Sequence, residues 1–156
     1  MWSFNKKQGL ISPVSGQCIS LKNINDEVFS KLMLGDGIAI EPTSEIVVSP
    51  VDGIVEVIME DTCHAVGLKM KNGIELLIHV GVDTVNLQGK GFKCLVKAGD
   101  KVKVGSPLIE FNKKIIEDNG YKATVIFIVT DDKDKEIKFK NETDLVCAGE
   151  DMVLDI

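Results

Sequence analysis

Short apolar runs separated by turn residues dominate the chain. Five of them lie at residues 46–48, 54–58, 76–80, 102–104 and 125–129, between segments rich in Gly, Pro, Asn or Asp. Evenly spaced runs of this length are typical of β-strands. Helical patterning is confined to residues 26–34 and 113–119, each enough for a short helical turn. The pattern therefore predicts an all-β, antiparallel sandwich or barrel with one or two short helical turns.

Two sequence patterns recur along the chain. Residues 11–16 read Ile-Ser-Pro-Val-Ser-Gly, and residues 48–53 read Val-Ser-Pro-Val-Asp-Gly. A Gly-Asp pair at residues 35–36 returns at 99–100, with a Gly-Glu-Asp variant at 149–151. The repetition indicates two related halves packed face to face, although turn chemistry alone would also explain it. No linker interrupts the pattern, so we expect a short tail over residues 1–9 and a single domain over residues 10–156.

The charge of the chain narrows the range of partners. The 156 residues carry a formal net charge of −6, and all 18 basic residues are Lys. An acidic chain is a poor match for nucleic acid, whose phosphates select basic surfaces, but it suits docking to basic proteins. Without Arg, bidentate phosphate clamps are absent. Any phosphate chemistry must use His, Lys, hydroxyl or backbone N–H groups.

The cysteines and the apolar runs bear on localisation. Cys18, Cys63, Cys94 and Cys147 are scattered, with no CxxC pair and no apolar leader segment before them. We therefore expect four reduced thiols in a cytoplasmic protein, mostly as small buried side chains. The longest apolar run, residues 125–129, is far too short to span a bilayer.

The only two histidines, His64 and His79, flank an expected hairpin. Asn72-Gly73 between apolar runs predicts a two-residue type I′ turn. In the register of such a turn, the numbers of facing residues sum to 145, so His64 faces Gly81 and His79 faces Val66. Both imidazoles then lie on one face as diagonal neighbours, with Cβ atoms about 7–8 Å apart.

A pair of facing imidazoles permits two kinds of chemistry. One ring can attack a phosphoryl group while the other stabilises the transferring anion. The same pair can also supply two of the ligands of a zinc ion. In the predicted register, Thr62 and Asp83 lie farther along the same face, and Leu77 is the neighbour of His79. The geometry alone leaves both readings open.

The residues around the second histidine resemble a known signature. Residues 79–92, His-Val-Gly-Val-Asp-Thr-Val-Asn-Leu-Gln-Gly-Lys-Gly-Phe, meet every fixed position of the pattern HxGxDTVxLxGxGF. That pattern is typical of glucose-family enzyme IIA of the bacterial phosphoenolpyruvate-dependent sugar phosphotransferase system. Residues 62–65, Thr-Cys-His-Ala, resemble the family's TxHA segment. The likeness runs from about residue 10 to the end of the chain.

The resemblance implies a fold, a reaction and its residues. The fold would be the barrel-sandwich hybrid built from a duplicated hybrid motif. His79 would accept a phosphoryl group from the phosphocarrier protein HPr and pass it to a cysteine on the IIB domain of a sugar permease, with glucose as the family's default sugar. His64 would be the companion histidine, Thr62 would position it, and the carbonyl of Gly81 would fix the His79 tautomer. The family requires no cofactor.

The resemblance also implies how partners dock. An apolar disc around the histidines would receive both partners, and Asp26 and Asp83 would meet basic partner residues. The matching apolar positions are Val28, Phe29, Met33, Leu34, Leu77 and Val85. Leu77 is often Phe in the family, so the disc is less aromatic here. The short tail, with Trp2, Phe4, Lys6 and Lys7, would give at most peripheral membrane association. A start at Met favours a stand-alone protein over a domain cut from a fused permease.

Three other readings compete with this one. A zinc hydrolase of the lysostaphin-like type shares the HxxxD spacing of His79 and Asp83. Such an enzyme also needs an HxH pair, which a chain with only two histidines cannot supply. Zinc binding by His64 and His79 would need a further ligand from a partner. A swinging-arm carrier would have only Lys71 as a hairpin-tip lysine, without an acceptor motif around it. The last reading is a non-catalytic regulatory binding module.

Overall fold

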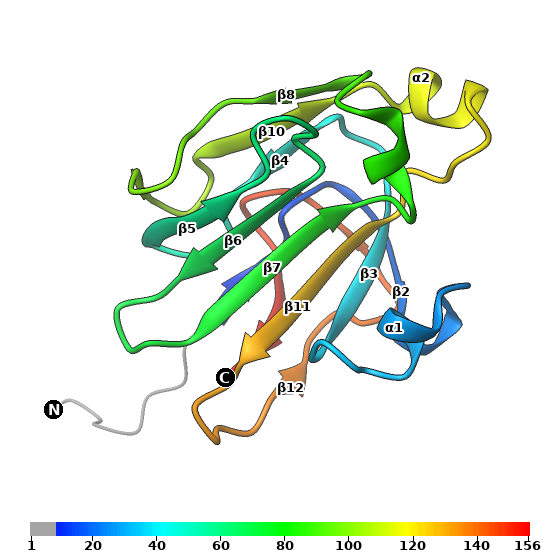
Figure 1. Ribbon diagram of the computed structural model, residues 1–156. Helices are drawn as coiled ribbons and strands as arrows, with labels where there is room; N and C mark the ends of the chain where they lie inside the picture. The colour runs from blue at the N-terminus through cyan, green and yellow to red at the C-terminus, as the bar shows by residue number, and fades with distance from the viewer. Residues whose placement is uncertain (1–8) are drawn as a thin grey trace, which may run out of the picture.

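The structure, a computed structural model, describes residues 9–156 and consists mainly of short strands (Figure 1). The expectations that concern residues 1–8, including the membrane-touching tail, lie outside the described residues. The strands are β1 (Gly9–Ile11), β2 (Gly16–Ser20), β3 (Asp36–Pro42), β4 (Ile46–Val48), β5 (Gly53–Ile58), β6 (Ala65–Lys69), β7 (Glu75–Val80), β8 (Phe92–Cys94), β9 (Lys101–Val102), β10 (Pro107–Phe111), β11 (Val125–Asp131), β12 (Lys138–Phe139), β13 (Leu145–Val146) and β14 (Met152–Asp155). The helices are α1 (Glu27–Ser30) and α2 (Lys113–Asp118), and the 3-10 turns are η1 (Leu21–Asn23) and η2 (Thr84–Leu87).

All strand pairs are antiparallel and fall into three sheets. The large sheet has the order β13-β2-β3-β11-β7-β6-β5-β9. Two smaller sheets, β1-β14-β12 and β4-β10-β8, have three strands each. In Figure 1, β7, β11 and β3 face the viewer, whereas β4, β10 and β8 lie along the upper edge. The predicted all-β antiparallel sandwich with two short helices is confirmed, and the five apolar runs all contribute strands.

The large sheet is buried on both faces near its centre. On β11, Val125, Phe127 and Val129 belong to the main core, which the small sheets share through residues such as Leu108 and Leu154. The intervening Ile126 and Ile128 point the other way and form a second, smaller apolar cluster with Phe29 of α1. Strand β7 alternates in the same manner, so its outward residues lie beside this second cluster.

The repeated Ser-Pro-Val segments form equivalent turns. Ser12 and Ser49 are fully buried, and their hydroxyls donate to the carbonyls two residues later, at 2.7 and 2.6 Å. The two turns are also joined to each other, because Ile11 N donates to Pro50 O and Val48 N to Pro13 O. The crossed bonds favour the interpretation of the repeat as two related halves.

A second set of bonds extends the equivalence of the two turns. Gly149 N donates to Ser12 O at 3.0 Å, and Gly105 N donates to Ser49 O at 2.9 Å. Each repeated turn therefore receives the amide of a glycine that lies far along the chain.

The register of the β6–β7 hairpin differs from the predicted one. Ala65 pairs with His79 and Val66 with Ile78, so the numbers of facing residues sum to 144. The predicted register was wrong because it would place Val66 on the same face as His79, whereas Val66 and Ile78 both lie in the main core. A slip of one residue moves a whole strand's side chains to the other face, so burial decides the register.

The turn of this hairpin contains an additional residue. Met70 N donates to Ile74 O and Gly73 N to Met70 O, which leaves Lys71, Asn72 and Gly73 as a three-residue loop. Gly73 has φ of 89°, the left-handed conformation that such loops require after a type I turn. Asn72 Oδ1 accepts from Ile74 N at 3.1 Å and stabilises the loop.

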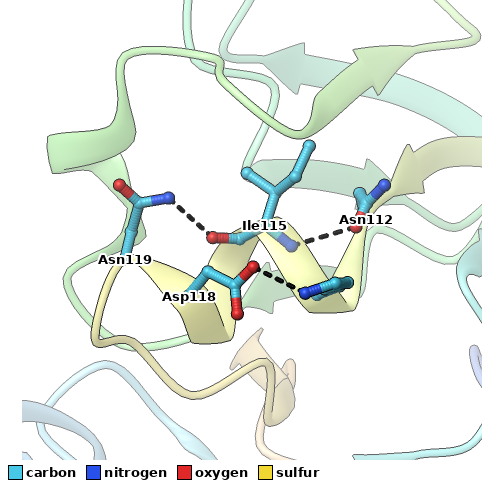
Figure 2. A network of polar contacts seen from close by, with 5 residues as sticks. Asn112, Ile115, Asp118 and Asn119 are labelled. Carbon is cyan, nitrogen blue, oxygen red and sulfur yellow. Dashed lines mark hydrogen bonds and ion pairs between the residues drawn. The ribbon is translucent and has the colours of Figure 1, made fainter.

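Both helices begin with side-chain caps. Asp26 precedes α1 and accepts from Val28 N at 2.9 Å. Asn112 caps α2 by accepting from Ile115 N at 3.0 Å, and Asn119 Nδ2 donates to Ile115 O at 2.7 Å (Figure 2). These contacts explain why short helices form at the two predicted places.

The cysteines do not all stay reduced. Cys63 and Cys94 form a disulfide, with Cα atoms 5.3 Å apart, so the expectation of four thiols was wrong. The spacing of 31 residues carries no signal for this pair; only the fold brings the β5–β6 loop against the end of β8. Cys18 is buried as expected, and burial raises the pKa of its thiol to about 11, while Cys147 is exposed.

Candidate active site

His79 is held in a regular strand at the centre of the large sheet. Strand β7 pairs with β6 on one side and with β11 on the other, where Ile126 faces His79. The ring is half-buried on the outward face. Its Nδ1 lies 2.7 Å from Gly81 O, a backbone carbonyl that can only accept, so Nδ1 carries the proton. The lone pair of the neutral ring is therefore on Nε2.

Gly81 is required by its surroundings. It has φ of 80°, and a Cβ there would lie 2.4 Å from Thr84 Cγ2 and 2.7 Å from Lys122 O. Gly81 N donates to Thr124 O at 2.7 Å. The peptide that orients the His79 ring is thus fixed from several directions. The expectation that Gly81 faces His64 was wrong, because Val80 N donates to His64 O instead.

His64 lies just before β6, in an irregular loop. In the observed register, a regular strand would have placed it on the core face, opposite to His79. The backbone is not regular there, since Cys63 has φ of 51°, a left-handed conformation that is rare outside glycine. His64 lies against His79, with ring centroids 4.8 Å apart and the ring planes nearly perpendicular. The two rings lie together as the sequence predicted, but local backbone geometry, rather than hairpin register, brings them there.

Thr62 orients the His64 ring. Its hydroxyl Oγ1 lies 2.7 Å from His64 Nδ1. When the hydroxyl donates to Nδ1, the proton of the neutral ring is on Nε2, and Nε2–H becomes a donor. His64 is only 5% exposed, so little solvent competes with Thr62 for its ring.

Both rings are held neutral near pH 7. Burial and, to a lesser extent, the neighbouring His79 lower the pKa of His64 from 6.5 to about 4. Burial also lowers the pKa of His79, opposed by the hydrogen bond to Gly81 and by the carboxylates of Asp26 and Asp83. A nucleophilic imidazole must be neutral, because a protonated nitrogen has no lone pair to attack with.

Phe29 forms one wall of the site. Its ring centroid lies 5.2 Å from that of His79, and its side chain is buried in the outer apolar cluster. Leu77, half-buried, belongs to the border of the same cluster. These two predicted disc residues therefore contact or adjoin the histidine from within the fold, and exposed residues around them form the outer surface.

Six of the exposed apolar residues make up what we call the apolar rim. Its members are large, exposed apolar residues on α1 and the following turn, on η2, or at and just after the end of β5. They are Val28, Met33, Leu34, Val57, Met59 and Val85. Exposed apolar groups of this size, on elements that adjoin the buried His64 and the half-buried His79, are typical of a protein-binding surface.

Val57 and Met59 were missed by the sequence reasoning. Met59 N donates to Ala65 O at 3.4 Å, and Ala65 faces His79. Val57 faces Gly67, where its Cγ1 lies 2.7 Å from the place that a Cβ would occupy. The sequence signal that could have identified Val57 is Gly67, in the strand between β5 and β7. This small residue leaves room for the outward side chain of Val57. The irregular pairing of β5 hid which residues point outward.

No metal site accompanies the histidines in residues 9–156. In this range, no group of three or more His, Cys, Asp or Glu side chains is arranged to hold a metal ion. Within the same residues, no helix combines the length and the apolar character needed to cross a membrane. The lysostaphin-like zinc hydrolase interpretation is not supported, since Nδ1 of His79 bonds to Gly81 O and, among residues 9–156, no third candidate ligand accompanies His79 and His64.

Comparisons with known proteins agree with one another. Residues 8–135 match the family described as phosphoenolpyruvate-dependent sugar phosphotransferase system, EIIA 1. A protein of Staphylococcus epidermidis named PTS system glucose-specific EIIA component is 40% identical over 152 residues, which is 97% of this chain and 91% of the relative. A Staphylococcus aureus protein of the same name is 41% identical over 97% of this chain and 90% of the relative.

A solved structure gives the same result. Glucose permease IIA from Mycoplasma capricolum superposes on 99% of both chains with a TM-score of 0.92 and 35% sequence identity.

Proposed function

Because the chain belongs to the EIIA 1 family of the phosphoenolpyruvate-dependent sugar phosphotransferase system and is a phosphocarrier of sugar uptake, we propose that Nε2 of His79 carries the phosphoryl group. The hydrogen bond from His79 Nδ1 to Gly81 O carries this proposal, since it directs the lone pair to Nε2. The half-buried position allows a partner to approach while limiting hydrolysis by water.

The reaction consists of two transfers. Nε2 of His79 attacks the phosphorus of the phosphohistidine on HPr; the new N–P bond forms as the donor's N–P bond breaks, and the donor histidine keeps the electron pair. A cysteine thiolate on the IIB domain of the permease then attacks the same phosphorus, and His79 leaves as a neutral imidazole. Both partners are inferred from the resemblance to the family. The lack of Arg fits a site that must release the phosphoryl group as readily as it accepts it.

His64 acts on the transferring group without bonding to it. With Thr62 donating to Nδ1, His64 presents Nε2–H toward the phosphoryl oxygens on His79. A donor fixed in a buried site stabilises the charge that develops in the transition state. Its low pKa keeps His64 neutral, so it does not form a strong ion pair that would trap the phosphoryl group.

Partner docking uses the apolar rim together with Phe29 and Leu77. Asp26 and Asp83 are near enough to His79 to raise its pKa, and they would face basic residues on both partners. Asp26 also caps α1, so it has a structural role in addition to the proposed electrostatic one.

The remaining assignments follow the family. The transported sugar is glucose, as in the names of the staphylococcal relatives. The protein works in the cytoplasm, where HPr and the IIB domain are found, with residues 10–156 as a single EIIA domain and the tail giving at most peripheral membrane contact. The reaction requires no cofactor, and zinc would bind His64 and His79 only with a further ligand from a partner.

The test is to locate the phosphate. The protein is incubated with phosphoenolpyruvate, enzyme I and HPr, and the acid-labile phosphate is mapped by mass spectrometry under alkaline conditions. We expect one phosphate on His79 and none on a His79→Gln variant that retains the wild-type circular dichroism spectrum. Phosphate on another residue, or normal labelling of the variant, would contradict the assignment. No labelling of the wild type at all would favour the non-catalytic regulatory module.

A further inference from the structure

The disulfide between Cys63 and Cys94 lies beside the catalytic pair. Cys63 stands between Thr62 and His64, the two residues whose side chains bond to each other at 2.7 Å. Cys94 is the last residue of β8, which belongs to a different sheet from β6 and β7. The disulfide therefore joins the irregular loop that presents His64 to a separate sheet of the sandwich.

We propose that the Cys63–Cys94 disulfide is a positioning element for His64, and that its reduction slows phosphoryl donation from His79 while leaving acceptance intact. The proposal rests on the phosphocarrier function proposed above. It adds that phosphoryl donation depends on the redox state of the loop that carries Cys63 and His64.

The contacts of the loop show why the disulfide matters. The backbone of His64 is held independently, because its carbonyl accepts from Val80 N at 2.7 Å. Among the residues that the structure describes, the Thr62 side chain hydrogen-bonds only to His64. Cys63 is in a left-handed conformation, with its amide bonded to Met59 O at 2.6 Å. Releasing Cys63 therefore leaves the His64 backbone in place and chiefly affects the orientation of its ring through Thr62.

The opposite side of the loop is also closely packed. Gly89 has φ of 92°, and a Cβ there would lie 2.6 Å from Asp61 O, so the turn before β8 lies directly against the loop. This contact keeps the two cysteines near each other after reduction. The disulfide can therefore re-form without unfolding, as a reversible control requires.

The redox step is ordinary thiol–disulfide exchange. A thiolate of a dithiol reductant attacks Sγ of Cys94, the more exposed cysteine, and Sγ of Cys63 leaves as a thiolate and takes up a proton. The second thiol of the reductant then attacks the mixed disulfide and releases Cys94, so that two electrons and two protons pass to the protein. A low-molecular-weight disulfide such as oxidised glutathione reverses the step. Disulfides in cytoplasmic proteins are commonly transient and redox-sensing.

The experiment compares oxidised and reduced protein. Full-length protein is treated with oxidised glutathione or with dithiothreitol, and the thiols are counted by mass spectrometry after alkylation. Nitrogen-15 spectra then report the tautomers of both imidazoles. Single-turnover kinetics measure acceptance from phospho-HPr and donation to the IIB domain. We expect reduction to change the His64 ring signals, to leave those of His79 in place, and to slow donation about 10- to 100-fold, as a small misplacement of a catalytic group does.

Two variants provide controls. Cys94→Ser should behave like reduced wild type under both conditions. In the His64→Gln background, reduction should cause no further slowing, because the effect passes through His64; a disulfide that merely stabilises the fold would slow both backgrounds alike. Identical His64 signals in the two states, equal slowing in both backgrounds, or failure of oxidised glutathione to form the disulfide would each overturn the proposal. If neither state accepts phosphate, the proposed function fails, whereas the His64 spectra still decide the positioning role.

Discussion

The two histidine segments are built in opposite ways. His79 lies within β7, which has a hydrogen-bonded strand on each side, and its ring is fixed by one backbone carbonyl. His64 lies outside the strands, and its ring is fixed by a threonine side chain in a loop that a disulfide holds. His79, the proposed site of phosphorylation, thus has the more rigid support, and His64, its proposed helper, has the more adjustable one. Segments with few ordered backbone bonds are also those that open most easily.

Replacing the helper tests this division most directly. We expect His64→Gln to accept phosphate from HPr at close to the wild-type rate but to pass it on roughly 10²–10³-fold more slowly, since one fixed donor is lost from the transition state. The measurement is single-turnover transfer in each direction. Loss of acceptance with normal donation would mean that the roles of the two histidines are reversed.

Acidity should reveal the same difference in the stability of the protein. The pKa of His64 is about 4 in the folded protein and near 6.5 in the unfolded chain, so the unfolded chain binds more protons between these values. Stability should therefore fall as the pH drops from about 6.5 to about 4, with a loss from this group on the order of 2–3 kcal/mol. Urea unfolding at several pH values measures it.

The matched control for the acid effect is His64→Gln, in which this component of the pH dependence should disappear. Between pH 6.5 and pH 4, an unfolding free energy of the variant that falls as steeply as that of the wild type would show that His64 is not the group responsible.

The smallest effect should come from the charges at the edge of the site. Asp83→Lys places a like charge opposite a basic partner and should slow transfer from HPr several-fold at low salt. The difference from wild type should shrink as salt is added, because exposed charges are then screened. Asp26→Lys should do the same, with a further loss of helix stability, because Asp26 caps α1. A transfer rate that changes with neither substitution nor salt would show that electrostatic attraction does not contribute to docking.

The sequence predicted the regular parts of the molecule better than the irregular ones. Alternation and turn residues were enough for the strands at residues 46–48 and 76–80, and the HxGxDTVxLxGxGF signature identified His79 as the candidate nucleophile. The register of the hairpin was missed because the conformation of Gly73 adds a residue to the turn. The Cys63–Cys94 bond was missed because it depends on how two sheets pack, which local sequence does not encode.

The joined Ser-Pro-Val turns have a consequence for the synthesis of the protein. Ser12 receives the amide of Gly149 and itself donates to Asp151 O, and β1 pairs with β14. The turn at Ser12 therefore lacks these partners until residues 149–155 have been translated. Such distant pairing makes folding slow in general, because a long loop must close before any contact compensates for its ordering. We expect that nascent chains that lack residues 145–155 expose Leu10 and Val14, and that the phosphocarrier becomes competent only after β14 has left the ribosome.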